Sequence, residues 1–193
     1  MREDIEFRVR AFRKALVLAK GECSEECRHL GRWTTDLHNF PHGSCDMASN
    51  CLAQYLTDKK CGHPFIIYMN GSGLENSTFH GHVIVMLDGE YIDLTLDQFD
   101  EYPDYIVSEA VESQGVIGTL LRRIGEIEGS IETRPINLSS FNKRGEDMYA
   151  WLRDKADKIF DEDEERQALQ QKIDDLTTKA LREMFPPNEL SKR

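Results

Sequence analysis

The dipeptide Asp88-Gly89 constrains the fold of this chain more than any other short feature, because it lies between two strand-like runs. The runs cover residues 79–87 and 90–94 and contain many β-branched and aromatic residues. Asp-Gly between two such runs is the strongest short signal for a β-hairpin. The sequence therefore predicts two adjacent antiparallel strands, and the length of the turn fixes which residues face each other.

A two-residue turn at this position gives a specific register. Ile84 then faces Asp93, and His82 faces Thr95, so that all four side chains lie on one face of the sheet. Asp93 becomes the diagonal neighbour of His82, roughly 7–8 Å away between backbones and within reach of an imidazole–carboxylate contact. A three-residue turn would put the two side chains on opposite faces.

Helical patterns precede the strands. Apolar residues recur at helical spacing over residues 4–20, and Gly21 ends that helix. Residues 21–43 have a mixed pattern that predicts a short helical stretch near 25–30 and then a loop. A further helix is predicted from Cys45 to about Asp58, where the apolar residues again follow helical spacing.

From Pro64 onward the pattern becomes extended. Residues 65–69 form a short apolar run closed by Asn-Gly-Ser-Gly, the hairpin follows, and residues 104–107 are compatible with one more strand. Helices first and consecutive antiparallel strands afterwards favour an α+β domain over a doubly wound parallel sheet.

The C-terminal third differs in composition. Residues 117–127 fit a strand or a helix equally well, and residues 146–184 are helical in pattern. The acidic run 161–165 interrupts the apolar stripe, which predicts two helices or one long interrupted helix, ended by Pro186-Pro187. We therefore expect an α+β domain over residues 1–140 and an acidic helical extension over residues 141–193.

Composition and charge limit the classes of partner. The 193 residues carry a formal net charge of −11, which argues against binding to nucleic acid or to an anionic membrane surface. A basic peptide substrate or a basic protein partner is compatible with this charge, and the acidic C-terminal helices are a candidate docking element. The sequence contains no apolar stretch of 18 residues, so it predicts no membrane-spanning helix.

The cysteine count and the charged N-terminus predict a cytoplasmic location. The first ten residues lack the apolar segment of a secretory signal peptide. The five cysteines are an odd number, which is typical of reduced thiols and not of a disulfide framework. We expect a cytoplasmic protein.

Cys45 follows the segment Phe40-Pro41-His42-Gly43-Ser44, at the point where a loop becomes a helix. Ser44 is a suitable N-cap, and Pro41 and Gly43 keep the preceding residues out of the helix. The positive end of the helix dipole and the free N–H groups favour thiolate over thiol, and thiolate is the nucleophile.

A nucleophilic thiolate needs a base, and the base needs an orienting group. The hairpin register makes His82 the candidate base and Asp93 the candidate orienting residue. The oxyanion of a tetrahedral intermediate needs donors. The backbone N–H of Cys45 is one by position, and the side chains of Asn39 and Gln98 are candidates for the second.

These segments resemble the papain-like and transglutaminase-like superfamily of cysteine hydrolases, in particular its small bacterial members. The resemblance rests on the Pro-His-Gly-Ser-Cys-Asp segment at Cys45, on His82 before the hairpin, and on Tyr-Ile-Asp-Leu-Thr around Asp93. It covers about residues 38–107. It implies a papain-like core with Cys45 as nucleophile, His82 as base and Asp93 as orienting residue, without a cofactor or a metal ion.

The chain also departs from that pattern. Val83-Ile84 stands where relatives commonly have Ala-Trp, and His80 is a rival base two positions before His82. The two histidines with Cys45 or Asp93 are an alternative zinc site, since alternate strand residues share a face.

A second loose metal candidate combines Cys23 and Cys27 with His29 and His38. Cysteines four residues apart share a helical face, so packing explains this pair more simply than metal binding.

Three hypotheses for function follow. The first is a thiol-dependent hydrolase of a peptide or amide bond. The second keeps the same acyl-enzyme but resolves it with an amine, as in a transglutaminase-like acyltransferase, or acts as a deamidase on a protein. The third is an inactive papain-like scaffold that acts as a binding or regulatory protein through its C-terminal helices.

Overall fold

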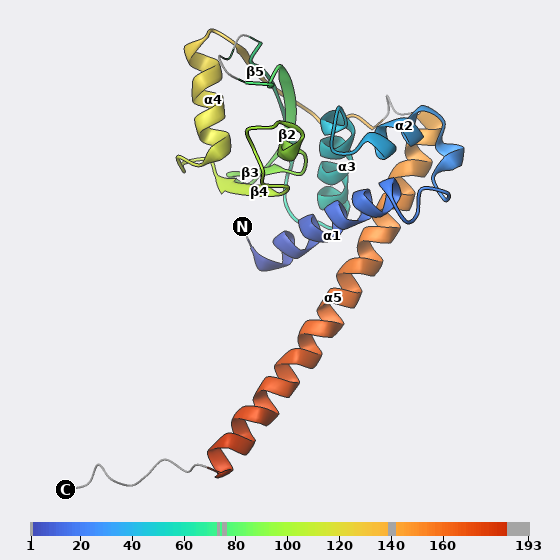
Figure 1. The fold of residues 1–193 in the computed structure, drawn as a ribbon, viewed down its shortest axis with the longest axis vertical. Helices are drawn as coiled ribbons and strands as arrows, with labels where there is room; N and C mark the ends of the chain where they lie inside the picture. The colour runs from blue at the N-terminus through green and yellow to red at the C-terminus, as the bar shows by residue number, and fades with distance from the viewer. Residues whose placement is uncertain (1, 73, 75–76, 139–141, 185–193) are drawn as a thin grey trace, which may run out of the picture.

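A computed structural model describes residues 2–72, 74, 77–138 and 142–184. Its centre is an antiparallel sheet of five strands in the order β4-β3-β2-β1-β5, with helices on both faces (Figure 1). The fold is therefore mixed α+β, as the order of helical and extended patterns predicts. The helices are α1 (Glu3–Lys20), α2 (Arg32–Asn39), α3 (Cys45–Asp58), α4 (Val116–Glu126) and α5 (Asn142–Met184). The strands are β1 (Phe65–Asn70), β2 (Gly81–Leu87), β3 (Glu90–Asp93), β4 (Val107–Ala110) and β5 (Ser130–Arg134).

The hairpin has the predicted two-residue turn. Leu87 pairs with Glu90, and the ladder continues through Val85 and Ile92. Asp88 and Gly89 adopt φ angles of 48° and 89°, in the left-handed region that Gly and Asp tolerate best. This register places His82 and Asp93 on the same face of the sheet.

Two helical predictions need correction. Residues 21–43 contain the helix α2 where we expected a loop, because Trp33 and Leu37 bury one side of a short helix whose other positions are polar. The apolar stripe over residues 146–184 belongs to one continuous helix, α5, so the acidic run 161–165 does not break it. The ambiguous segment 117–127 is the helix α4.

Two strands also differ from expectation. The strand expected at 104–107 lies at Val107–Ala110, where it pairs with β3. The strand β5 was not predicted, because its side chains are exposed or half-buried and give no alternating apolar signal. It pairs with β1 at the edge of the sheet.

The sheet separates two apolar clusters. One lies between the sheet and α1, α2, α3 and the first part of α5, and includes Val83 and Val85 from β2. The other lies under α4 and includes Ile84 from the same strand. Alternate residues of β2 thus serve both clusters, which buries this central strand on both sides.

The first part of α5 belongs to the main core. Met148, Leu152 and Ala156 are fully buried, and Phe160 is almost so. The boundary expected at residue 140 therefore does not separate the α5 segment up to Phe160 from the core. Beyond it, α5 extends away from the body of the protein (Figure 1). The predicted stop at Pro186-Pro187 lies outside the described residues.

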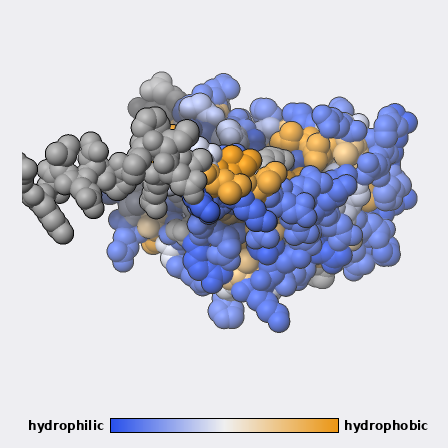
Figure 2. Space-filling view, turned by 90° about the horizontal axis from the view of Figure 1, so that it is seen from below, coloured by the Kyte–Doolittle hydropathy of each residue, from blue (hydrophilic) through white to orange (hydrophobic). Residues whose placement is uncertain are grey.

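The projecting part of α5 carries exposed apolar residues, namely Leu169, Ile173, Leu176 and Leu181. Figure 2 looks at the protein from this end and shows a largely hydrophilic face with apolar residues in separate areas. Among the helices that the structure describes, none combines the length and the apolar content needed to cross a membrane.

Candidate active site

Cys45 is the first residue of α3, as the sequence predicts. Ser44 occupies the N-cap position, but its hydroxyl donates to the carbonyl oxygen of Pro41 at 2.9 Å and makes no capping bond to the helix. Ser44 therefore occupies the predicted N-cap position but does not form the predicted capping hydrogen bond. The N–H groups of the first turn have no intrahelical acceptor.

One hydrogen bond fixes α3 to the strand that carries the histidine. The buried Ser49 hydroxyl, one helical turn after Cys45, donates to the carbonyl oxygen of Val83 at 2.8 Å. Val83 directly follows His82. The bond therefore holds the N-terminal part of α3 beside the start of β2.

His82 and Asp93 form a buried pair. Nε2 of His82 lies 2.6 Å from Oδ2 of Asp93, and both side chains are fully buried. The other carboxylate oxygen, Oδ1, accepts the backbone N–H of Thr95 at 2.7 Å and its hydroxyl at 3.3 Å. Because both oxygens have donors, the carboxylate is held in one orientation toward the ring.

The surroundings of His82 favour its charged form. Burial by itself would lower the pKa of His82, but the charge and hydrogen bond of Asp93, with a smaller contribution from Cys45, raise the pKa to about 10. Since Nε2 faces Asp93, Nδ1 is the ring nitrogen left for the Cys45 sulfur. Cys45 is half-buried, whereas the His82 and Asp93 side chains are fully buried.

Aromatic rings enclose the imidazole. Phe99 packs edge-on against His82 with 5.2 Å between ring centroids, and Phe79 does so at 6.1 Å. Both rings belong to the cluster under α4. They exclude water from the ring and fix its plane.

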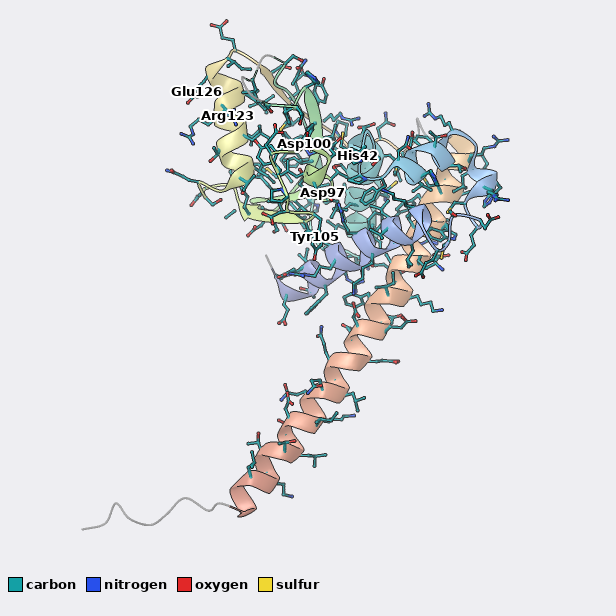
Figure 3. All side chains as sticks on the ribbon, in the orientation of Figure 1. His42, Asp97, Asp100, Tyr105, Arg123 and Glu126 are labelled. Carbon is teal, nitrogen blue, oxygen red and sulfur yellow. The ribbon has the colours of Figure 1, made fainter. Side chains whose placement is uncertain are left out.

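Gln98 lies closer to this group than the sequence indicated. Its Nε2 is 3.2 Å from Nδ1 of His82, and its Oε1 accepts the backbone N–H of Gly43 at 3.3 Å. The two segments that meet here carry the labelled residues His42 and Asp97 in Figure 3. Asn39, the other oxyanion candidate, is exposed at the end of α2.

The rival base His80 has a different position. It precedes β2, and its side chain is exposed, whereas its carbonyl oxygen accepts the N–H of Gly71 at 2.9 Å. The side chain that bonds to Asp93 is that of His82.

Neither zinc alternative receives support from the geometry. Across the described ranges, no three His, Cys, Asp or Glu side chains are arranged to hold a metal ion. Cys27 is buried in the main core, where burial raises the pKa of its thiol to about 11. Packing therefore accounts for Cys27.

Arg13 supports the site from α1 and was not predicted from the sequence. Its buried guanidinium donates to the carbonyl oxygen of Leu94 and makes two bonds to Asp97, at 3.1 and 2.7 Å. These contacts fix the segment between Asp93 and Gln98. An arginine within an apolar helical stripe was the available signal, since a buried charge needs a partner.

Comparison with known proteins gives relatives but no activity. The chain is 39% identical over 127 residues to the uncharacterized protein YuaU of Escherichia coli strain K12 and, equally, to that of strain UTI89. The match covers 64% of this chain and 55% of each relative, so the chain spans about half the length of the curated relatives that it matches. No family model and no solved structure matches.

Proposed function

We propose that the chain is a papain-like cysteine hydrolase that cleaves a peptide or amide bond. One observation carries this proposal: the buried 2.6 Å contact between His82 and Asp93, at a ring whose pKa is also raised by Cys45 on the N-terminus of α3. This contact supports the roles of nucleophile, base and orienting residue that thiol catalysis requires.

The mechanism follows from these contacts. The Cys45 thiolate attacks the substrate carbonyl carbon, and the carbonyl electron pair moves onto oxygen. The backbone N–H of Cys45 donates to this oxyanion, because no side chain caps the first turn of α3. As the intermediate collapses, the bond to the amine breaks and Nδ1 of His82 gives its proton to the leaving amine.

Hydrolysis of the thioester completes the cycle. His82 takes a proton from water, the resulting hydroxide attacks the acyl carbon, and the carboxylic acid leaves as the Cys45 thiolate re-forms. Asp93 holds the ring throughout. The net charge of −11 supports a basic segment as the substrate.

Mass spectrometry of a peptide mixture incubated with the full chain tests this proposal. We expect new peptide termini with the wild type and none with Cys45→Ala. Absence of cleavage by the wild type across basic, neutral and acidic peptides would contradict a peptide hydrolase. A millimolar primary amine in a parallel sample separates the alternatives, since an acyltransferase incorporates the amine in preference to water.

A further inference from the structure

The Gln98 side chain holds three groups at once. Its Oε1 accepts the Gly43 N–H at 3.3 Å, while its Nε2 donates to the carbonyl oxygen of Thr95 at 2.9 Å. The same nitrogen lies 3.2 Å from Nδ1 of His82. The glutamine therefore links the loop before Cys45 to the base.

These contacts determine which way the amide points. An exchange of its oxygen and nitrogen would bring the NH₂ group against the Gly43 N–H and the oxygen against the Thr95 carbonyl. Both contacts would be repulsive. The amide therefore presents an N–H to Nδ1 of His82, and Nδ1 must accept it with its lone pair.

This acceptor role conflicts with the charged ring that the reaction uses. In the imidazolium form Nδ1 carries a proton, so it would face the NH₂ group of Gln98 at 3.2 Å as a second donor. The Gln98 contact stabilises the neutral ring, whereas Asp93 and Cys45 stabilise the charged ring.

We infer that Gln98 is a positioning residue that limits protonation of His82 by donating a hydrogen bond to Nδ1, and that its amide must turn away when Nδ1 takes up a proton. The turn also releases the Gly43 N–H, so the charge of the ring and the loop before Cys45 change together. This inference rests on the proposed function for its relevance to catalysis, although the contact itself does not depend on it.

Few other groups compete for the ring. Among the described residues, the charged or titratable groups that raise the pKa of the ring are Asp93 from β3 and Cys45 from α3. The rings of Phe79 and Phe99, which pack against its edges, carry no charge. A change at Gln98 is therefore expected to affect His82 directly.

The test is ¹⁵N NMR of the His82 ring nitrogens in the full chain from pH 5 upward, far enough into the alkaline range to pass the midpoint of each variant. Gln98→Met keeps the length of the side chain and removes both hydrogen-bonding groups. Gln98→Glu places a carboxylate where it accepts a proton from Nδ1. Gln114→Glu, on an exposed loop, introduces the same charge away from the site and serves as the control.

We expect Gln98→Met to raise the pH at which Nδ1 loses its proton by about half to one unit, the effect of one ordinary hydrogen bond. Gln98→Glu should raise it further, and Gln114→Glu should leave it unchanged. An unchanged or lower midpoint in Gln98→Met, or a smaller shift in Gln98→Glu than in Gln98→Met, would overturn the inference.

The measurement separates this inference from the proposed function. It reports the charge of the ring without any turnover, so the expected shifts in a chain that cleaves nothing would leave the inference intact and count against the hydrolase. A reactive Cys45 together with an unshifted midpoint in Gln98→Met would overturn this inference and leave the proposed hydrolase intact.

Discussion

Oδ2 of Asp93 lies 2.6 Å from Nε2 of His82 on the neighbouring strand, and neither side chain is exposed to solvent. A two-residue turn at Asp88-Gly89 is what brings them to one face. The backbone N–H and hydroxyl of Thr95 complete the environment of the carboxylate. The pair is therefore a product of the hairpin register.

Removal of the carboxylate is expected to destabilise the fold and the charged ring together. Asp93→Ala leaves a buried histidine without its partner, and the loss of one member of a buried pair costs about 3–5 kcal/mol. Asp93→Asn keeps a hydrogen-bonding group and should cost less, while lowering the pKa of His82. Urea unfolding measures the first effect and NMR titration the second; an Asp93→Ala variant as stable as the wild type would contradict the buried pair.

Stability should depend on pH through the same pair. Because the folded pKa of His82 is raised to about 10 from 6.5, the contribution of the pair is fully present below pH 6.5 and is lost as the pH rises toward 10. The difference in free energy of unfolding between the wild type and His82→Gln should therefore shrink over this range. Denaturant unfolding at pH 6, 8 and 10 checks it, and a difference that grows with pH would contradict the raised pKa.

The hydrogen bond from Ser49 to Val83 is expected to position the nucleophile as well as to stabilise the protein. Ser49→Ala leaves the Val83 carbonyl oxygen without this donor inside the protein, at a cost of about 1–3 kcal/mol, and should slow alkylation of Cys45. Thr57→Ala in the same helix is the control, because its hydroxyl donates to the carbonyl oxygen of Ala53, one turn earlier in the same helix. If both variants alkylate at the same rate, Ser49 does not position the sulfur.

The sequence predicted the start of α3 at Cys45 and the hairpin register, but it missed elements at the edges of the fold. Cys45, His82 and Asp93 could be related because a helix start and a hairpin register are local features. Gln98 could not be ranked above Asn39, because its position depends on contacts with Gly43 and Thr95 that form only in the folded chain.

The unpredicted elements share a physical cause. The strand β5 has no buried residue, and α2 has only two, so neither shows the periodic apolar pattern that reveals an element. The acidic run 161–165 suggested a break in α5, but the three glutamates in it are good helix formers, and the run interrupts only the apolar stripe.

The projecting part of α5 is expected to contribute little to stability. The last residue of α5 that packs into the core is Phe160, and the Asp163 carboxylate bonds to Lys14 at 2.6 Å. A chain that stops after Glu165 should melt within a few degrees of the full chain, whereas Phe160→Ala should cost about 3–5 kcal/mol. Thermal unfolding followed by circular dichroism measures both, and a large loss in the shortened chain would show that residues 166–193 stabilise the folded protein.

The reactivity of Cys45 toward iodoacetamide tests the central claim most directly. Cys23, which is also free and half-buried, provides an internal control in the same sample. Mass spectrometry after short exposure at pH 6 should show Cys45 modified much faster than Cys23, and His82→Ala should remove most of the difference. If Cys45 reacts no faster than Cys23, or reacts equally fast without His82, then Cys45, His82 and Asp93 do not form a catalytic triad.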